Sequence, residues 1–336
     1  MGFKRLDAED FVVSADAVQS VAWSTGAPTI TEFYTSSVQA AGSSGNYYLS
    51  IYQTSSTDST AAVQFDIAYG NVNGSGSTPF NSGLPLYSPS SVTYGQYRSL
   101  VLEDENSSFT FGDGTNSITS DDFWVLSIER ARYKEKLFPG TFNLTLQGGG
   151  GTIQLTDNSN DVLTQTFIGT TRVLQIVSGS NGSAYNTTGY VAGSGSYGLF
   201  LPDIGTILLN PDAVSQSIHV VPNRNSTVAN GNNQATLYTA ISGGASFTLN
   251  AEETITSDYI FVRSRNAEFN YSENPSFISG STGEVIYTQF INNPQVYVTT
   301  VGLYNDANEL VAVAKLSKPL LKDFTKESLV RVKLDF

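Results

Sequence analysis

Cysteine is absent from the 336 residues, and histidine occurs once, as His219. A chain without cysteine has no disulfide framework, no thiolate zinc site and no cysteine nucleophile. One imidazole cannot build a histidine-rich metal site either. We therefore expect a fold that is stabilised by packing and hydrogen bonds, with no cofactor and no metal.

Charged residues are also scarce, at 14% of the chain against the usual ~25%. The 17 basic and 30 acidic residues give a net charge of −13, which argues against a nucleic-acid partner. No run of 18 apolar residues is present to span a membrane. The opening residues 1–10 lack the apolar segment of a secretion signal, so we expect no membrane partner and folding in a cytosol.

The abundant residues point to β-structure. Hydrophobic residues make up 40% of the chain and aromatic residues 12%, with 18 Tyr, 19 Phe and 30 Gly. Tyr, Phe and β-branched residues fit pleated sheets, and Gly, Ser and Asn fit turns. The composition predicts an all-β, multi-domain fold of β-sandwich modules with long Gly/Ser/Asn-rich loops.

Alternating apolar and polar residues locate the expected strands. They lie at 46–53, 62–69, 141–146, 152–155, 163–168, 172–177, 246–249, 259–263, 297–304, 310–316 and 329–336. The segment 123–137 is interpreted as a strand that leads into a charged bend, and Gly148–Gly151 as a hairpin tip. Long loops are expected at 71–91, 178–196 and 223–234.

The distribution of charge suggests the domain boundaries. Only six residues among the 110 of the segment 141–250 are charged, whereas the flanking regions are ordinary. This predicts an N-terminal β-rich domain at 1–140, a low-charge module or insertion at 141–250, and a C-terminal β-sandwich at 251–336 that could pack on the first domain.

Within the C-terminal domain, the strands at 297–304 and 310–316 are apolar on both faces. Such strands are typical of a central pair that is buried on two sides. The last strand alternates, and it predicts Val330, Val332, Leu334 and Phe336 inward with Arg331 and Lys333 outward.

Six basic and three acidic residues follow position 311, so a basic strip lies on an otherwise acidic chain. We expect this strip to contact a neighbouring copy or another acidic protein. An edge strand that Lys residues protect from aggregation would have the same composition. The candidate interface residues are Lys315, Lys318, Lys322, Arg331 and Lys333.

Signals for catalysis are weak. The stretch 193–198 matches G-x-G-x-x-G, but Leu-Phe-Leu-Pro follows instead of a helix start. His219 lies in a strand-like run at 217–221, and the chain has no G-x-S-x-G elbow. The acidic clusters at 103–105, 121–122 and 252–253 are adjacent residues, which on a strand point to opposite faces. We interpret them as solvated turns rather than a carboxylate pair or a calcium site, and we expect no enzyme.

The segment 299–316 contains the run Gly-Leu-Tyr-Asn-Asp-Ala-Asn-Glu-Leu-Val-Ala-Val-Ala-Lys-Leu, which resembles a strand–turn–strand of phage tail-collar fibre and baseplate-associated proteins. The stretches 3–7, 94–98, 129–137 and 270–284 are similar to virion structural proteins of contractile-tailed cyanophages. The resemblance implies a virion part and carries no catalytic residues.

Composition and resemblance together predict a structural component of a contractile-tailed phage virion. A baseplate or tail assembly protein that bridges neighbouring subunits is the first expectation. It would be assembled in the host cytoplasm, in several copies, with other virion structural proteins as partners. The alternatives are a capsid-vertex, decoration or neck protein, and a tail protein that binds a host glycan or receptor.

Overall fold

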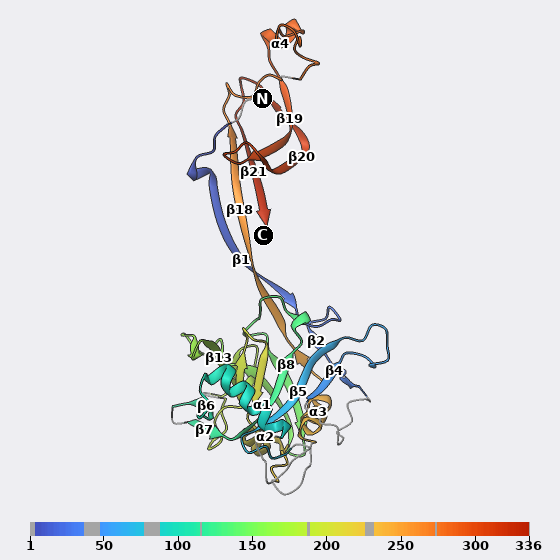
Figure 1. Ribbon diagram of the computed structural model, residues 1–336, viewed down its shortest axis with the longest axis vertical. Coiled ribbons are helices and arrows are strands. Elements are labelled where there is room, and N and C mark those ends of the chain that lie inside the picture. The colour runs from blue at the N-terminus through green and yellow to red at the C-terminus, as the bar shows by residue number, and fades with distance from the viewer. Residues whose placement is uncertain are drawn as a thin grey trace. The chain divides into compact units, whose positions relative to one another are not determined.

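The computed structural model describes residues 4–36, 48–76, 88–114, 116–186, 189–225, 232–272 and 274–335. Strands make up 45% of the protein and helices 15%, so the fold is all-β, with more than one domain, as expected. The chain divides into two compact units (Figure 1), unit 1 from Met1–Ala17 with Thr254–Phe336 and unit 2 from Val18–Glu253. None of the described helices is long and apolar enough to cross a membrane.

Unit 2 contains most of the secondary structure. Its strands are β2 (Thr29–Ile30), β3 (Tyr34–Thr35), β4 (Tyr48–Tyr52), β5 (Val63–Asn71), β6 (Phe109–Asp113), β7 (Asn116–Ser120), β8 (Asp122–Ile128), β9 (Lys136–Leu137), β10 (Asn143–Gly148), β11 (Gly151–Asp157), β12 (Thr166–Ile168), β13 (Thr171–Ser180), β14 (Ser183–Ala184), β15 (Gly198–Leu201), β16 (Thr206–Leu209) and β17 (Phe247–Thr248). Its helices are α1 (Pro89–Tyr97), continued by a π-helix (Arg98–Leu102), a 3-10 turn (Arg130–Arg132), α2 (Pro211–Ile218) and α3 (Asn233–Gly244).

Unit 1 is built mainly of long strands. The division between the units falls within β1 (Phe11–Val21) and β18 (Asn250–Ser264). The other elements of unit 1 are a 3-10 turn (Ala8–Asp10), α4 (Thr288–Asn292), β19 (Val296–Tyr304), β20 (Leu310–Lys322) and β21 (Ser328–Asp335). In unit 1, β18 pairs with β21, and β19 pairs with β20 as a two-stranded sheet.

Within the described residues, thirteen strands of unit 2 form a single sheet. Its order is β2-β17-β10-β11-β13-β15-β16-β8-β5-β4-β3, with β12 and β14 paired to β13 at the side. The expected hairpin is confirmed, because Gly148 of β10 pairs with Gly151 of β11 and leaves a two-residue turn. The strand and charged bend expected at 123–137 are β8, the 3-10 turn and β9.

The expected boundary at 140/141 is wrong. The strands β4 and β5 come from the region before it and β10 to β17 from the region after it, yet all belong to the same sheet. The segment 141–250 is not a separate module, and its central strands β15 and β16 are buried on both faces, which leaves no place for charge there. The expected boundary at 250/251 lies close to the division after Glu253. No pattern in the sequence indicated that residues 1–17 belong with the C-terminal part.

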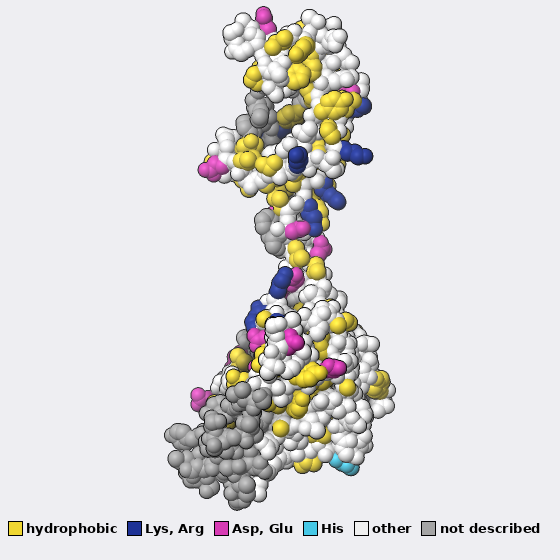
Figure 2. All heavy atoms as spheres, turned by 90° about the vertical axis from the view of Figure 1, so that its right-hand side faces the viewer, with side chains coloured by type: hydrophobic (Ala, Val, Ile, Leu, Met, Phe, Trp, Pro, Cys, Tyr) yellow, Lys and Arg dark blue, Asp and Glu magenta, His cyan; other side chains and the backbone are white. Residues whose placement is uncertain are grey.

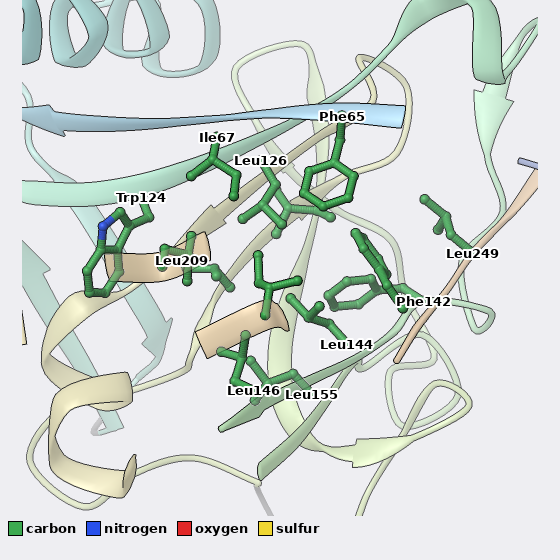
Figure 3. Packing of buried hydrophobic residues seen from close by; sticks show 14 of the residues in the cluster. Phe65, Ile67, Trp124, Leu126, Phe142, Leu144, Leu146, Leu155, Leu209 and Leu249 are labelled. Carbon is green, nitrogen blue, oxygen red and sulfur yellow. The ribbon is translucent and has the colours of Figure 1, made fainter. Parts of the chain in front are cut away.

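Alternating residues of the central strands fill two separate cores. Trp124, Leu126 and Ile128 of β8 lie in one cluster, whereas Phe123 and Val125 lie in the other. Side chains of α2 and α3 complete the first core, part of which Figure 3 shows. Side chains of α1 and β6 complete the second.

The sheet curls until distant strands meet across the first core. The rings of Phe65 on β5 and Phe247 on β17 lie 5.3 Å apart between centroids, although six strands separate β5 from β17 in the sheet order. Trp23 lies 4.8 Å from the same Phe247 ring. The curl thus encloses an aromatic cluster that buries large apolar areas.

Helices α1, α2 and α3 were not expected. Pro211 opens α2, and the side chain of Asn210 accepts a hydrogen bond from the backbone N–H of Asp212 at 3.0 Å. The helix ends at His219, whose φ of 57° is left-handed. The strand-like interpretation of the run at 217–221 is therefore wrong, because capping signals outweighed its β-branched residues.

The expected long loops are only partly described. Their portions at 77–87, 187–188 and 226–231 lie outside the described residues. The loop expected at 71–91 runs into α1, and that at 223–234 runs into α3. The loop expected at 178–196 includes β14 and a bridge between Val191 and Gly195, so it carries more pairing than its composition suggested.

Replacing Phe65 by alanine tests the curled core. Phe65 is fully buried, so Phe65→Ala is expected to lower the free energy of unfolding of unit 2 by about 3–5 kcal/mol. Phe167, which is 54% exposed, provides the control. Phe167→Ala is expected to change the free energy of unfolding by no more than about 0.5 kcal/mol. Urea unfolding followed by tryptophan fluorescence measures both, because Trp23 and Trp124 lie in this core. Equal effects of the two variants would contradict the packing described.

Candidate assembly interface

The structure separates the five basic residues of the candidate interface. Lys315 and Lys318 are exposed on β20, and Arg331 and Lys333 are exposed on β21, an edge strand of its sheet. Lys322, at the end of β20, is fully buried. Several Lys and Arg side chains lie on the face of unit 1 that Figure 2 presents.

Lys322 is a structural residue, so its assignment to the interface is wrong. Its ammonium group donates to the backbone oxygen of Asn266 at 3.0 Å, to Oδ1 of Asn270 at 2.8 Å and to the backbone oxygen of Asp323 at 3.1 Å. An ammonium group has three N–H donors, and here each has an oxygen partner. Composition could not reveal this role, because two of the three oxygens come from a segment about fifty residues earlier in the chain.

Arg331 and Lys333 flank the ring of Tyr259, which lies directly opposite Lys333 on β18. The guanidinium carbon lies 5.4 Å and the ammonium nitrogen 5.9 Å from the ring centroid, within cation–π range. Lys333 also pairs with Asp335 at 2.8 Å, and this bond raises the pKa of Lys333 and lowers that of Asp335. The charges of this cluster are thus partly balanced within unit 1.

The register expected for the last strand is confirmed where it is described. Val332 is 5% exposed and lies opposite Ile260 of β18, while Val330 and Leu334 are half-buried. Phe336, which was also expected to pack inward, lies outside the described residues.

The β19–β20 hairpin forms as expected, but it is not buried. Leu310 is 53%, Val311 66% and Val313 58% exposed on β20, and Tyr297 is 66% exposed on β19. The expectation of a central pair failed because the sheet contains only these two strands. A two-stranded hairpin with exposed apolar faces is at best marginally stable in water.

Unit 1 as a whole has almost no hydrophobic core. Of its described residues, only Ile260 and Val332 are buried hydrophobic residues, whereas unit 2 contains dozens. Fifteen of the 25 large hydrophobic residues that are exposed in the described protein lie in unit 1, which is less than a third of the chain. Exposed apolar surface of this extent is typical of sites of interaction.

The irregular middle of the hairpin limits how it can pair. Val298 lies opposite Leu320 and Thr300 opposite Lys315, so extra residues of β20, including Lys318 and Pro319, bulge out of the ladder. A bulge interrupts an edge, and proline has no N–H to donate. The side-chain faces of the hairpin, rather than this edge, are therefore suited to contact.

Unit 2 contains a cavity of about 270 Å³ that the sequence did not indicate. It lies between α1 and the sheet, and Asp66, Tyr97 and Ser127 are among the residues that line it. Burial raises the pKa of Asp66, with a smaller contribution from the charge of Glu129, and a hydrogen bond with Ser50 opposes the shift. Oδ1 of Asp66 has no hydrogen-bond partner among the described residues.

The structure also places two of the remaining sequence candidates, the run 193–198 and Asp122. The run 193–198 follows Val191 in a bridged turn and leads into strand β15, not into a helix. Asp122, interpreted as part of a solvated turn, is in fact buried and bonds Arg224 at 2.7 Å and Tyr69 at 2.6 Å. Within the described ranges, no group of three or more His, Asp or Glu side chains could hold a metal ion.

Comparison with known proteins identifies no relative: no family model, no curated protein and no solved structure matches the chain.

The carboxyl group of Asp66 should make the stability of unit 2 depend on pH. A carboxyl group whose pKa is raised by folding binds its proton more tightly in the folded state. The free energy of unfolding therefore falls as the pH rises from the ordinary pKa of the group to its raised pKa in the folded protein. Asp66→Asn removes this titration. We expect the variant to exceed the wild type in stability at about pH 7, by a margin that shrinks as the pH is lowered.

Thermal unfolding followed by tryptophan fluorescence over a pH series measures this difference. Asp16 is exposed on β1, so Asp16→Asn is the matched control for loss of one negative charge. Parallel pH profiles for the wild type and Asp66→Asn would show that the burial of Asp66 has no energetic consequence.

Proposed function

We propose that the protein is a structural component of a contractile-tailed phage virion, with a role in the baseplate or tail assembly, where it bridges neighbouring subunits. The observation that carries this proposal is the contrast between the two units. Unit 2 buries its apolar residues in two complete cores, whereas unit 1 exposes apolar strands that need a cover. A rigid body joined to an incompletely buried unit is the organisation of a protein that works in a larger assembly.

The phage assignment rests on the sequence. The hairpin at 299–316 that resembles tail-collar fibre and baseplate-associated proteins lies within the exposed strands β19 and β20. The segment with this resemblance is therefore also the segment whose apolar side chains have the greatest need of a partner. The scarcity of charge supports large permanent contacts, because the central parts of interfaces are depleted in charged residues.

Purified particles and their cryo-electron microscopy map test the assignment. We expect the chain in the tail, with a copy number of about six or a small multiple of it, as the sixfold tail requires. A position in the head lattice or neck would support the capsid or neck alternative. A position at an exposed tip in contact with host glycan would support the receptor-binding alternative. Absence of the chain from particles would overturn the proposal.

The basic side chains around Tyr259 offer a second test. Arg331→Glu combined with Lys333→Glu should leave unit 2 folded, because both residues belong to unit 1 and are exposed. In a phage that carries the double variant, we expect at least a tenfold loss of assembled particles through like-charge repulsion at the contact. Lys134, 80% exposed on unit 2, provides the control variant Lys134→Glu. Normal assembly of the double variant would show that these two residues do not take part in the contact.

A further inference from the structure

We infer that the partner which covers unit 1 is a second copy of this chain, and that the apolar face of the β19–β20 hairpin forms the contact between copies. This inference rests on the proposed structural role and specifies its partner.

The face in question is set by the register of the hairpin. Gly302 lies opposite Val313, and Tyr304 lies opposite Leu310, so these four residues share one face near the turn. We call them the hairpin face. Leu310 and Val313 are each more than half exposed, and Tyr304 is 42% exposed. Gly302 has no side chain, and the side chains of Tyr304 and Leu310 lie close to it, 3.1 Å and 3.3 Å from where a Cβ atom would be.

The amount of exposed apolar surface on unit 1 is sufficient for a stable interface. Half-exposed Val, Leu and aromatic side chains leave roughly 50–100 Å² each in water. The fifteen such residues of unit 1 therefore leave on the order of 1,000 Å² per copy over the whole unit. An interface of standard size, ~800 Å² per partner, would thus include other exposed residues of unit 1 beside the hairpin face.

The charge of unit 1 favours a copy of itself over an acidic partner. Unit 1 has ten basic and thirteen acidic residues, whereas unit 2 has seven and seventeen. Three of the basic residues are paired within unit 1: Lys4 with Glu268, Lys326 with Asp323 and Lys333 with Asp335. Two of the six basic residues of the strip, Lys326 and Lys333, thus have an acidic partner within unit 1. The net charge of unit 1 is −3, so two copies can approach each other without strong repulsion.

The presence of further copies of the chain where it is synthesised points to the same partner. A unit with two buried hydrophobic residues cannot offset the conformational entropy of about a hundred residues by itself. The exposed apolar surface of unit 1 must therefore be covered by a partner as soon as the unit folds. Further copies of the chain are present wherever it is made, and most stable oligomers of soluble proteins consist of identical chains.

The mass of the purified full-length chain in solution is the first test. We expect sedimentation equilibrium to give a multiple of 36.0 kDa at micromolar concentration. Val311→Asp combined with Val313→Asp should raise the dissociation constant at least a hundredfold, so that the protein becomes monomeric, because charges would be buried without partners. The matched control is Val221→Asp on unit 2, since Val221 is 59% exposed and Val313 is 58% exposed. Tryptophan fluorescence from Trp23 and Trp124 verifies that unit 2 is folded in each variant.

A crosslink that leaves the apolar surface intact is the second test. Because the chain has no cysteine, Val313→Cys introduces the only thiol, and Val221→Cys does the same on the control surface. A short bis-maleimide joins one thiol from each of two copies by adding each across a C=C bond, so neither oxidant nor reductant is needed. We expect a covalent dimer from Val313→Cys and not from Val221→Cys.

A wild-type protein that is monomeric at micromolar concentration, or a Val313→Cys protein that forms no more dimer than the control, would overturn the inference. If that monomer nevertheless bound a different virion protein through the hairpin, self-association would be wrong while the proposed structural role would stand. If the protein self-associated but were absent from virions, the structural role would be wrong and the interface between copies would stand.

Discussion

The structure depends on one constraint: a sheet has two faces, and apolar side chains on each face must be covered. Unit 2 satisfies it by curling its sheet around one core and by covering the outer face with α1 and the β6–β7 hairpin. The strands of unit 1 alternate in the same way, but among its described residues only two hydrophobic side chains, Ile260 and Val332, are buried. The proposed function follows from this difference, because we infer that a second molecule supplies the cover that unit 1 lacks.

Local patterns in the sequence predicted the all-β class, most strands, the hairpin at Gly148–Gly151 and the inward side of β21. These features depend on alternation and turn residues within a few positions of each other. The domain boundary at 140/141 failed because low charge was attributed to a separate module, whereas the segment belongs to the same sheet and its strands β15 and β16 are buried on both faces. The helices were missed because short helices such as α2 depend on capping by Asn210 and Pro211 rather than on a long periodic pattern.

The candidate site was predictable only in part. Exposure of Arg331 and Lys333 follows from alternation, but the burial of Lys322 depends on oxygens of Asn266 and Asn270 that only the fold brings to it. The apolar hairpin was recognised from its residues and then assigned to the interior, because periodicity cannot tell a strand covered by its own chain from one covered by another molecule. The contact of Arg331 with the Tyr259 ring and the cavity at Asp66 had no signal in the sequence, since each brings together residues from separate strands.

Hydrogen exchange of the wild-type protein at several concentrations tests the central claim, that unit 1 completes its burial only in contact with other copies. The account predicts that amide protection in β18 to β21 rises with protein concentration as the copies associate, while protection in the sheet of unit 2 stays constant. Strong protection of β19 and β20 at concentrations where the protein sediments as a monomer of 36.0 kDa would contradict it, because unit 1 would then be stable without a partner.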